Sequence, residues 1–465
     1  MIIKGANYRD CFNDKRLEKR GLDLLRRLFS GSTRAIQQIS MSRAEQKGFY
    51  RFLNNEKVKE SSLIEELSGR CGESVKGKLV LSIQDTTEIN LSRHAGRLKA
   101  DSGLGSIDAV LKGVGFKMHP SLVIDAATLF PFGWADIHIW HRGMEKKSLT
   151  RYEMQKLEIE EKESFKWIAA AQKSKEVLKQ ASAVIIVQDR EADIYDQFVR
   201  VPDERTFLLI RSRCDRNLTD GTKLWDHVQT QACSGIYSAH IEADKRRGLQ
   251  KREAVIEVRY ASATLKKPAG TGKDKESVVV NVVEARETTE GIENPIEWKL
   301  ITTLPVQSFE DACQVIDWYR CRWMIEEVFR VLKKEGFHIE GSELESGWAI
   351  RKLSLMIMDT VIKLFQMQYA YSLPEEEMEA AVSFTEAEIS CLQSLNTRLE
   401  GSTDKQSNPY KTGSLAWASW IIARLGGWKG YQSQRPPGIT TWCHGLKKFY
   451  SIFEGWTLQI NVGTP

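Results

Sequence analysis

The pattern of apolar and polar positions divides the chain into three zones. Up to about residue 70, apolar residues such as Leu24 and Leu28 recur at helical spacing, behind the potential cap residues Asn13 and Asp14. From 71 to 372, apolar runs of strand length alternate with helical segments, and from about 373 the pattern is helical again. We therefore expect an α/β domain at 71–372 between helical domains at 1–70 and 373–465.

The middle zone contains two short apolar runs, at 79–84 and 184–187, that predict buried strands. Further β-like segments at 254–260, 277–285 and 298–303 predict a β-rich insertion at about 216–305. The pattern Ser308-x-x-Asp311 that follows is a capping box, which predicts one helix from 308 to about 335, ended by Gly336.

The charge balance changes this picture only slightly. The 465 residues carry 67 basic and 62 acidic side chains, and the formal net charge is +5. Residues 1–70 hold 15 Lys and Arg against 9 Asp and Glu, so the basic surplus lies in the first helical zone. Such a surplus is a mild indication of nucleic-acid binding. A solvated helical surface would have the same composition.

Cysteine usage and hydropathy indicate a cytoplasmic protein. None of the eight cysteines forms a Cys-x-x-Cys pair, which disfavours a structural zinc site and favours reduced thiols. The first ten residues lack the basic and apolar stretches of a signal peptide, and no apolar run reaches the roughly 18 residues that span a bilayer. We expect a cytoplasmic protein with no membrane partner.

Three carboxylates occupy positions suited to metal binding. Asp85 and Asp189 each follow directly after a predicted buried strand, and Glu326 lies in the middle of the predicted 308–335 helix. A polar residue at a strand end projects into the crevice beyond the sheet, where ligands bind in α/β proteins. Carboxylate oxygens suit Mg²⁺, and two such ions can stabilise both the attacking and the leaving oxygen of a phosphate displacement. An aspartate after a strand can equally be a turn or helix-cap residue.

The predicted helix also carries an aligned polar stripe. Tyr319, Arg322, Glu326, Arg330 and Lys333 are spaced three or four residues apart and share one helical face. A polar stripe is usually the solvated face of a helix. Because the same segment is rich in large apolar residues, it is expected to be largely packed, so the polar stripe needs partners such as metal and phosphate.

These motifs resemble those of a known family. The spacing Tyr319-x-x-Arg322-x-x-x-Glu326-x-x-x-x-x-x-Lys333 is similar to the Tyr-Arg-Glu-Lys signature of the insertion-sequence-four family of DDE transposases. The segment Asp189-Arg190-Glu191-Ala192-Asp193-Ile194 resembles the second-aspartate motif of this family, and Gln84-Asp85-Thr86-Thr87 resembles the first. Residues 13–16 and 48–55 resemble its DNA-binding domain, and residues 422–427 resemble its C-terminal domain.

The resemblance implies a fold, a reaction and partners. The fold would be a ribonuclease-H-like core interrupted by a β insertion, with a helical DNA-binding domain at 1–70 and a helical dimerisation domain at 373–465. The reaction would be metal-dependent hydrolysis of transposon ends, a hairpin intermediate and joining of the 3′ ends to target DNA. Two Mg²⁺ ions per site, for which Mn²⁺ can substitute, double-stranded DNA and a homodimer in the synaptic complex would be required. The host would be a bacterium and the location its nucleoid.

The resemblance also implies roles for individual residues. Asp85, Asp189 and Glu326 would be the catalytic metal ligands. Trp298 and Trp323 match the tryptophans that hold a displaced base, and aromatic stacking suits that role. The other expected DNA contacts are Tyr319, Arg322, Lys333, Arg190, Arg330, Arg16, Arg20 and Arg51, with Arg26 and Arg27 as further basic candidates.

Two departures from the family pattern and two rival functions remain. Asn13 stands where the family usually has Gly, and Arg330 lies four residues after Glu326, so details of end recognition and phosphate contact are open. A DNA-binding protein without catalysis would tolerate loss of a carboxylate, but all three are present. A stand-alone nuclease would not need Trp298, Trp323 and the C-terminal domain.

Overall fold

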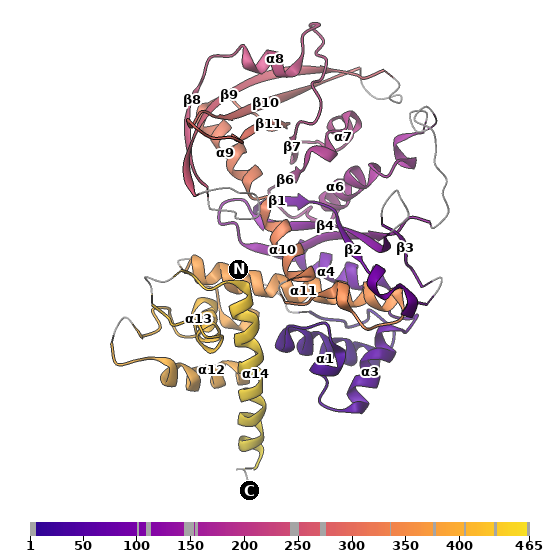
Figure 1. Cartoon of the computed structure of the whole chain (residues 1–465), viewed down its shortest axis with the longest axis vertical. Coiled ribbons are helices and arrows are strands. Elements are labelled where there is room, and N and C mark those ends of the chain that lie inside the picture. Colours follow the sequence, from indigo (N-terminus) through magenta and orange to yellow (C-terminus); the bar gives the residue numbers. More distant parts are fainter. Residues whose placement is uncertain are drawn as a thin grey trace.

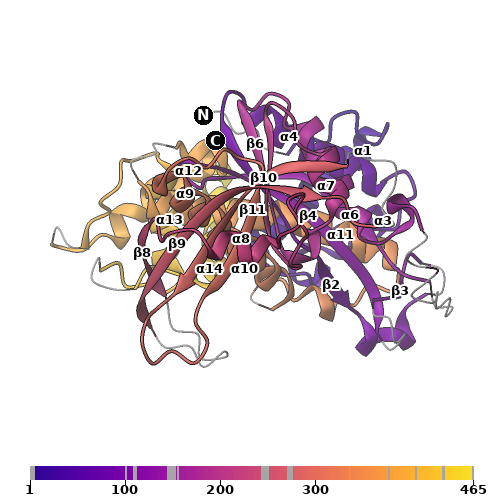
Figure 2. The same ribbon diagram turned by 90° about the horizontal axis from the view of Figure 1, so that it is seen from above.

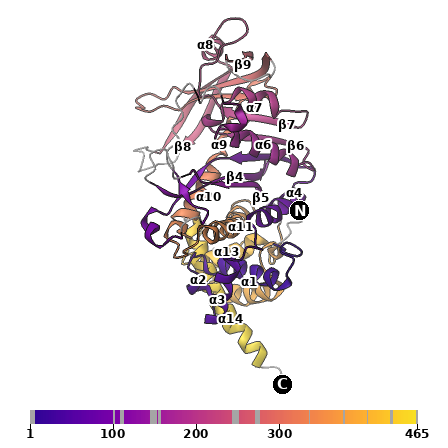
Figure 3. The ribbon, with the colours of Figure 1, turned by 90° about the vertical axis from the view of Figure 1, so that its right-hand side faces the viewer.

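The computed structural model describes residues 6–99, 102–107, 113–143, 153, 157–241, 251–269, 276–334, 336–374, 378–403, 406–431 and 435–462. In this part of the chain, a large twisted sheet with its own helices lies above a layer of helices that come from both ends of the sequence (Figure 1). Seen from the side, the long C-terminal helix extends away from the sheet (Figure 3).

The N-terminal helices are built on clear local signals. They are α1 (Lys15–Gly31), α2 (Ile36–Ile39), α3 (Arg43–Leu53) and α4 (Glu60–Ser74). Asp14 caps α1 by accepting from the Arg16 backbone N–H at 2.9 Å, and the Ser42 hydroxyl caps α3 by accepting from the backbone N–H of Glu45 at 3.1 Å. Of the two predicted cap residues for α1, Asp14 therefore fills the position.

A glycine allows the first helix to pack closely. A side chain at Gly21 would lie within 3.0 Å of the rings of Tyr8 and Phe52, which are buried. Because no Cβ is present, α1 approaches the aromatic core formed with Phe12 and Phe49. This helical zone is therefore a packed unit with an apolar centre.

The strands of the first part of the sheet are β1 (Leu79–Gln84), β2 (Thr87–Asn90), β3 (Gly105–Ser106), β4 (Val114–Asp125), β5 (Pro131–Trp140), β6 (Ala183–Gln188) and β7 (Thr206–Arg211). β4 pairs antiparallel with β5 on one side and with β1 and β2 on the other, and β1, β6 and β7 run parallel. The order β5-β4-β1-β6-β7 is the mixed sheet of a ribonuclease-H-like core, so the predicted fold class is confirmed.

The predicted β-rich segment continues the same sheet. Its strands are β8 (Gly235–Ile241), β9 (Arg252–Lys266), β10 (Ser277–Glu287) and β11 (Glu297–Thr302). β11 pairs antiparallel with β7, and the sheet continues through β10 and β9 to β8. Among the described residues, eleven strands form this sheet, and Figure 2 shows how far it twists between β2 and β8.

Helices cover the sheet and bury its core side chains. The helices that follow β5 and β6 are α6 (Phe165–Val177) and α7 (Tyr195–Arg200), and α8 (Leu224–Gln229) packs on β9 and β10. α6 contacts β1, β4 and β5, whereas α4 and α11 (Gly347–Ser372) pack on β5. α11 is buried along nearly its whole length because it lies between the sheet and the other helices.

The C-terminal zone is helical, as the pattern predicted. It contains α12 (Glu386–Leu399), α13 (Leu415–Leu425) and α14 (Ile439–Val462), and α13 packs on both α11 and α14. α1 contacts α11 and α14, so both ends of the sequence meet in one layer. Within the described helices, none combines the length and hydropathy that a bilayer crossing needs.

The helix predicted over 308–335 is interrupted in the structure. The capping box forms as expected, with Ser308 and Asp311 capping each other's backbone N–H groups. The segment then divides into α9 (Phe309–Arg320) and α10 (Trp323–Lys333). Between them the bonds tighten to three-residue spacing, as from the Arg322 N–H to the Tyr319 carbonyl at 3.0 Å. The prediction of one continuous helix was therefore wrong at this turn, which changes the direction of the side chains that follow.

A buried ion-pair network joins α4 to α11. The Arg70 guanidinium lies 2.8 Å from carboxylate oxygens of both Glu66 and Asp359, and all three side chains are largely buried. Burial is the main cause that raises the pKa of the Glu66 carboxyl. Because two buried carboxylates share one cation, the interface depends on Arg70.

We predict that Arg70→Ala lowers the free energy of unfolding by about 3–5 kcal/mol, because it leaves two buried carboxylates without their cation. Denaturant unfolding followed by circular dichroism would measure the change. The control is Arg16→Ala, whose side chain is 89% exposed and whose loss should cost under about 0.5 kcal/mol. An equal, small effect of both substitutions would contradict the role of the network.

Candidate active site

Two aspartates leave the sheet side by side. β1 and β6 are parallel neighbours in register, with Gln84 paired to Gln188 at their last positions. Asp85 and Asp189 are the next residue on each strand, and neighbouring strands lie about 4.8 Å apart. Behind them, the buried Gln188 amide donates to the Gln84 carbonyl oxygen at 2.6 Å, which holds the two strand ends together.

Glu326 reaches the same place from α10, and Arg322 connects it to the sheet. The Arg322 guanidinium donates to Asp85 Oδ2 at 2.9 Å and also to Glu326 Oε1. Arg322 stands in the turn between α9 and α10, four residues before Glu326. The structure therefore brings Asp85, Asp189 and Glu326 to one edge of the sheet, with a guanidinium between two of them.

The electrostatics of the site favour a cation. Burial raises the pKa of Asp85 to about 6, and the charges of Asp189 and Glu326 add to this rise, whereas Arg322 and the Thr86 backbone N–H oppose it. Three oxygen-donor carboxylates with a single arginine among them are the ligand chemistry of a hard divalent ion. The residues present therefore fit a divalent metal.

Arg322 bridges two of the three carboxylates. Across the part of the chain that the structure describes, no three acidic, histidine or cysteine side chains converge as a ready-made metal cage. Because the guanidinium bonds to Asp85 and Glu326, it holds their oxygens around itself. Metal binding would therefore require Arg322 to release them.

An aromatic pair flanks the second aspartate. The rings of Trp298, on β11, and Tyr319, on α9, meet edge to face at 5.5 Å between centroids. Burial, followed by the negative charge of Asp189, raises the pKa of Tyr319 to about 12. Its hydroxyl therefore stays protonated and can donate a hydrogen bond. Trp298 is half-buried.

The remaining predicted site residues surround these groups at different distances. Lys333 Nζ donates to Thr87 Oγ1 at 3.2 Å, next to the Asp85 strand end. Trp323 is 45% exposed, and the Cζ atom of the Arg322 guanidinium lies over its ring, 5.9 Å from the ring centroid of Trp323. Arg190 is exposed beside Asp189, whereas Arg330 forms an ion pair with Glu327 on its own helix.

The N-terminal basic residues differ in how freely their charge is available. Arg16, Arg20, Arg26 and Arg51 are exposed on α1 and α3. Arg27 is 28% exposed and lies 3.4 Å from Glu45 and 2.8 Å from Glu454 on α14. The structure therefore offers four of these arginines to solvent and commits Arg27 to ion pairs within the chain.

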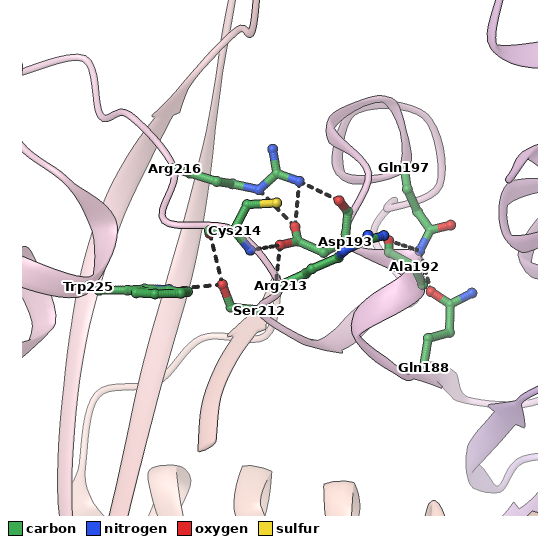
Figure 4. Close-up of polar contacts among 9 residues, drawn as sticks. All are labelled: Gln188, Ala192, Asp193, Gln197, Ser212, Arg213, Cys214, Arg216 and Trp225. Carbon is green, nitrogen blue, oxygen red and sulfur yellow. Dashed lines mark hydrogen bonds and ion pairs between the residues drawn. The ribbon is translucent and has the colours of Figure 1, made fainter. Parts of the chain in front are cut away.

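A buried aspartate near Asp189 was not assigned a role from the sequence. Asp193 ends the motif that begins at Asp189, and its carboxylate is fully buried among the residues after β7 (Figure 4). It accepts hydrogen bonds from the backbone N–H groups of Arg213 and Cys214 and from the Arg216 side chain. The only sequence signal for it was its place in the motif, because its partners lie 20 or more residues away.

Comparison with known proteins identifies two regions of the chain. Residues 9–58 match a family model described as transposase DNA-binding, and residues 119–358 match one described as transposase DDE domain. The second match covers more than half of the chain and includes Asp189 and Glu326, whereas Asp85 precedes it.

A solved structure of the piggyBac transposase synaptic complex with hairpin DNA also aligns with the chain. The alignment has 8% sequence identity, covers 85% of this chain and 79% of that one, and has a TM-score of 0.32. This overlap is too loose to inform the site. The DDE domain match carries the assignment, since that domain implies metal-dependent phosphoryl transfer and the N-terminal match implies DNA binding. The chain belongs to the DDE transposase family.

Proposed function

We propose that this protein is a cut-and-paste transposase of the insertion-sequence-four type, similar to the transposon-five transposase. It would bind transposon ends, cleave them through a hairpin intermediate and join the 3′ ends to target DNA. The observation that supports this proposal most directly is the meeting of Asp85, Asp189 and Glu326 at the ends of β1 and β6. The spacing of Tyr319, Arg322, Glu326 and Lys333 also supports the insertion-sequence-four type.

Asp85, Asp189 and Glu326 would hold the metal. DDE transposases use divalent ions, and we propose two Mg²⁺ ions, replaceable by Mn²⁺. When bound, they would polarise the attacking water or 3′-hydroxyl and the leaving oxygen of each in-line displacement on phosphorus.

The other side chains would position the DNA. Once released from the carboxylates, the Arg322 guanidinium can form paired hydrogen bonds with a phosphate. Lys333 would contact a phosphate near Thr87, and the protonated Tyr319 hydroxyl would donate to the backbone near Asp189. The half-buried Trp298 would stack its ring on a base that leaves the duplex during hairpin formation, and Trp323 would support it. Arg190 and Arg330 would add further backbone contacts.

The outer zones would supply DNA binding and assembly. Residues 1–70 would recognise the element ends through exposed arginines of α1 and α3, namely Arg16, Arg20 and Arg51. The helical zone 373–465 would dimerise, so that two copies hold the paired ends. The middle zone, 71–372, would carry the chemistry, with the strands of its β insertion presenting Trp298.

We predict that Asp85→Ala, Asp189→Ala and Glu326→Ala each lower end cleavage by at least roughly 10³-fold, because each removes a metal ligand worth several kcal/mol. Binding of end DNA should persist, since the N-terminal helices are untouched. Denaturing gels and a mobility-shift assay would measure the two effects. The control is Asp226→Ala, which removes an exposed acidic side chain on α8 and should leave cleavage normal. Normal cleavage by any triad variant would remove that residue from the site.

We predict that the Mg²⁺ concentration for half-maximal cleavage is flat above about pH 6 and rises about tenfold for each pH unit below it. Burial raises the pKa of Asp85 to about 6, so below this pH a proton on the Asp85 carboxyl competes with the metal. Calorimetric Mg²⁺ titrations would test the same dependence without turnover. If the Mg²⁺ concentration for half-maximal cleavage did not change between about pH 5 and pH 8, the assignment of Asp85 as a metal ligand would be contradicted.

We predict that Arg20→Ala and Arg51→Ala each weaken end binding and reduce its salt slope by about one, as expected for a lost phosphate contact. Arg27→Ala is the matched comparison on α1 and should leave the slope unchanged, because Glu45 and Glu454 already engage its charge. Fluorescence anisotropy at several salt concentrations would measure both. Equal losses for Arg20→Ala and Arg27→Ala would contradict this division of roles.

A further inference from the structure

We propose that Asp193 is a positioning residue whose buried carboxylate ties the turn bearing Asp189 to the strand bearing Trp298. The inference rests on the proposed function, in which Asp189 binds metal and Trp298 stacks on an extruded base. It assigns to Asp193 no contact with DNA or metal. Its role would be to keep these two groups at a fixed separation.

Both carboxylate oxygens of Asp193 are fully engaged by hydrogen-bond donors of the loop at 213–216. One carboxylate oxygen accepts from the backbone N–H groups of Arg213, at 2.8 Å, and Cys214, at 3.2 Å. The other accepts from Arg216 Nε at 2.8 Å and from Arg216 Nη2, which also donates to the Asp193 carbonyl at 2.6 Å. Figure 4 shows these contacts between Asp193 and the residues that follow β7. Since charged hydrogen bonds to fixed donors are directional, these hydrogen bonds hold the loop at 213–216 in one position.

Backbone hydrogen bonds connect Asp193 to the second aspartate of the site, Asp189. Residues Arg190–Ala192 form the short helix η3, in which the Ala192 N–H donates to the Asp189 carbonyl at 2.9 Å. The Asp193 N–H donates to the Arg190 carbonyl at 3.3 Å. Asp189 and Asp193 are therefore the two ends of a single turn. These two backbone bonds do not involve the Asp193 side chain, so they hold the turn bearing Asp189 when the Asp193 charge is removed.

On the other side, the same loop is joined to β11. The Ser212 N–H donates to the Lys299 carbonyl at 2.7 Å, and Arg211 pairs with Leu300 across β7 and β11. The Ser212 hydroxyl also accepts from Trp225 Nε1 at 3.1 Å. Trp298 is the residue before Lys299. The loop that Asp193 holds is therefore hydrogen-bonded to the strand that carries Trp298.

This connection predicts a selective defect. First-strand nicking needs the carboxylates, whereas hairpin formation also needs Trp298 in position against the displaced base. A misplacement of about 1 Å can cost about 10²-fold in rate. Without the Asp193 charge, the β11 end can shift relative to η3, so the hairpin step should suffer more than the nick.

Asp193→Asn tests the charge while keeping the side-chain shape, and Arg216→Lys removes the forked geometry from the other partner. The matched control is Asp125→Asn at the opposite end of β1. Asp125 is also buried, and it accepts from the backbone N–H groups of Ala127 and Thr128 at 2.9 and 3.0 Å and pairs with Lys78 at 3.4 Å. Purified full-length variants would be given end DNA and Mg²⁺, with nicked and hairpin products followed over time.

We expect Asp193→Asn and Arg216→Lys to nick within about threefold of wild type but to form hairpins at least about tenfold more slowly. Trp298→Ala should share this pattern, and adding Asp193→Asn to it should cause little further loss, because both act through one ring. A substrate lacking the displaced base should partly restore hairpin formation in both single variants. Asp125→Asn should keep the wild-type ratio of hairpin to nick.

The inference is overturned if Asp193→Asn keeps the wild-type ratio, slows both steps equally, or adds fully to Trp298→Ala. If Asp193→Asn does not fold, the ratio measured for Arg216→Lys decides in the same way. Failure of the proposed function looks different, since wild type and Asp125→Asn would then not nick end DNA at all.

Discussion

The parallel pairing of β1 with β6 is the constraint on which the site depends. Main-chain hydrogen bonds set Gln84 opposite Gln188, and the buried bond between their amides adds a side-chain link at the same position. Buried amides need partners, so a slip of one strand by one residue would leave these amides unpaired and turn the aspartate of that strand to the other face. The position of Asp85 beside Asp189 is thus a result of strand register.

The chemistry of the site follows from how charge is balanced at this sheet edge. Asp85 is desolvated near two other carboxylates, and Arg322 supplies the compensating positive charge. A guanidinium can satisfy these oxygens but cannot activate a water molecule. An arginine that holds the carboxylates in the free protein and a phosphate in the complex would couple metal binding to DNA binding.

The extension of the sheet serves the same site from the other direction. Because β11 pairs with β7, the insertion returns to the core next to the turn that carries Asp189. Trp298 then meets Tyr319 of α9, which leads into the turn at Arg322. Strand pairing, one loop and one helix therefore surround the place where DNA would bend.

The sequence by itself determined the elements and the candidate chemistry. Strand-length apolar runs ending at Asp85 and Asp189, and the capping box at Ser308, depend on neighbours a few residues away, so they could be read locally. The resemblance to the transposase family added the ribonuclease-H-like class of the core, whereas the order of its strands came from the structure.

Only the tertiary structure decided which groups meet. The break between α9 and α10, the bridge of Arg322 to Asp85 and the clamp on Asp193 all depend on partners far along the chain. The pairing of Arg27 with Glu454 likewise depends on two helices from opposite ends of the sequence. Local propensity carries no information about such contacts, because their energies arise only when the packed chain removes these charges from water.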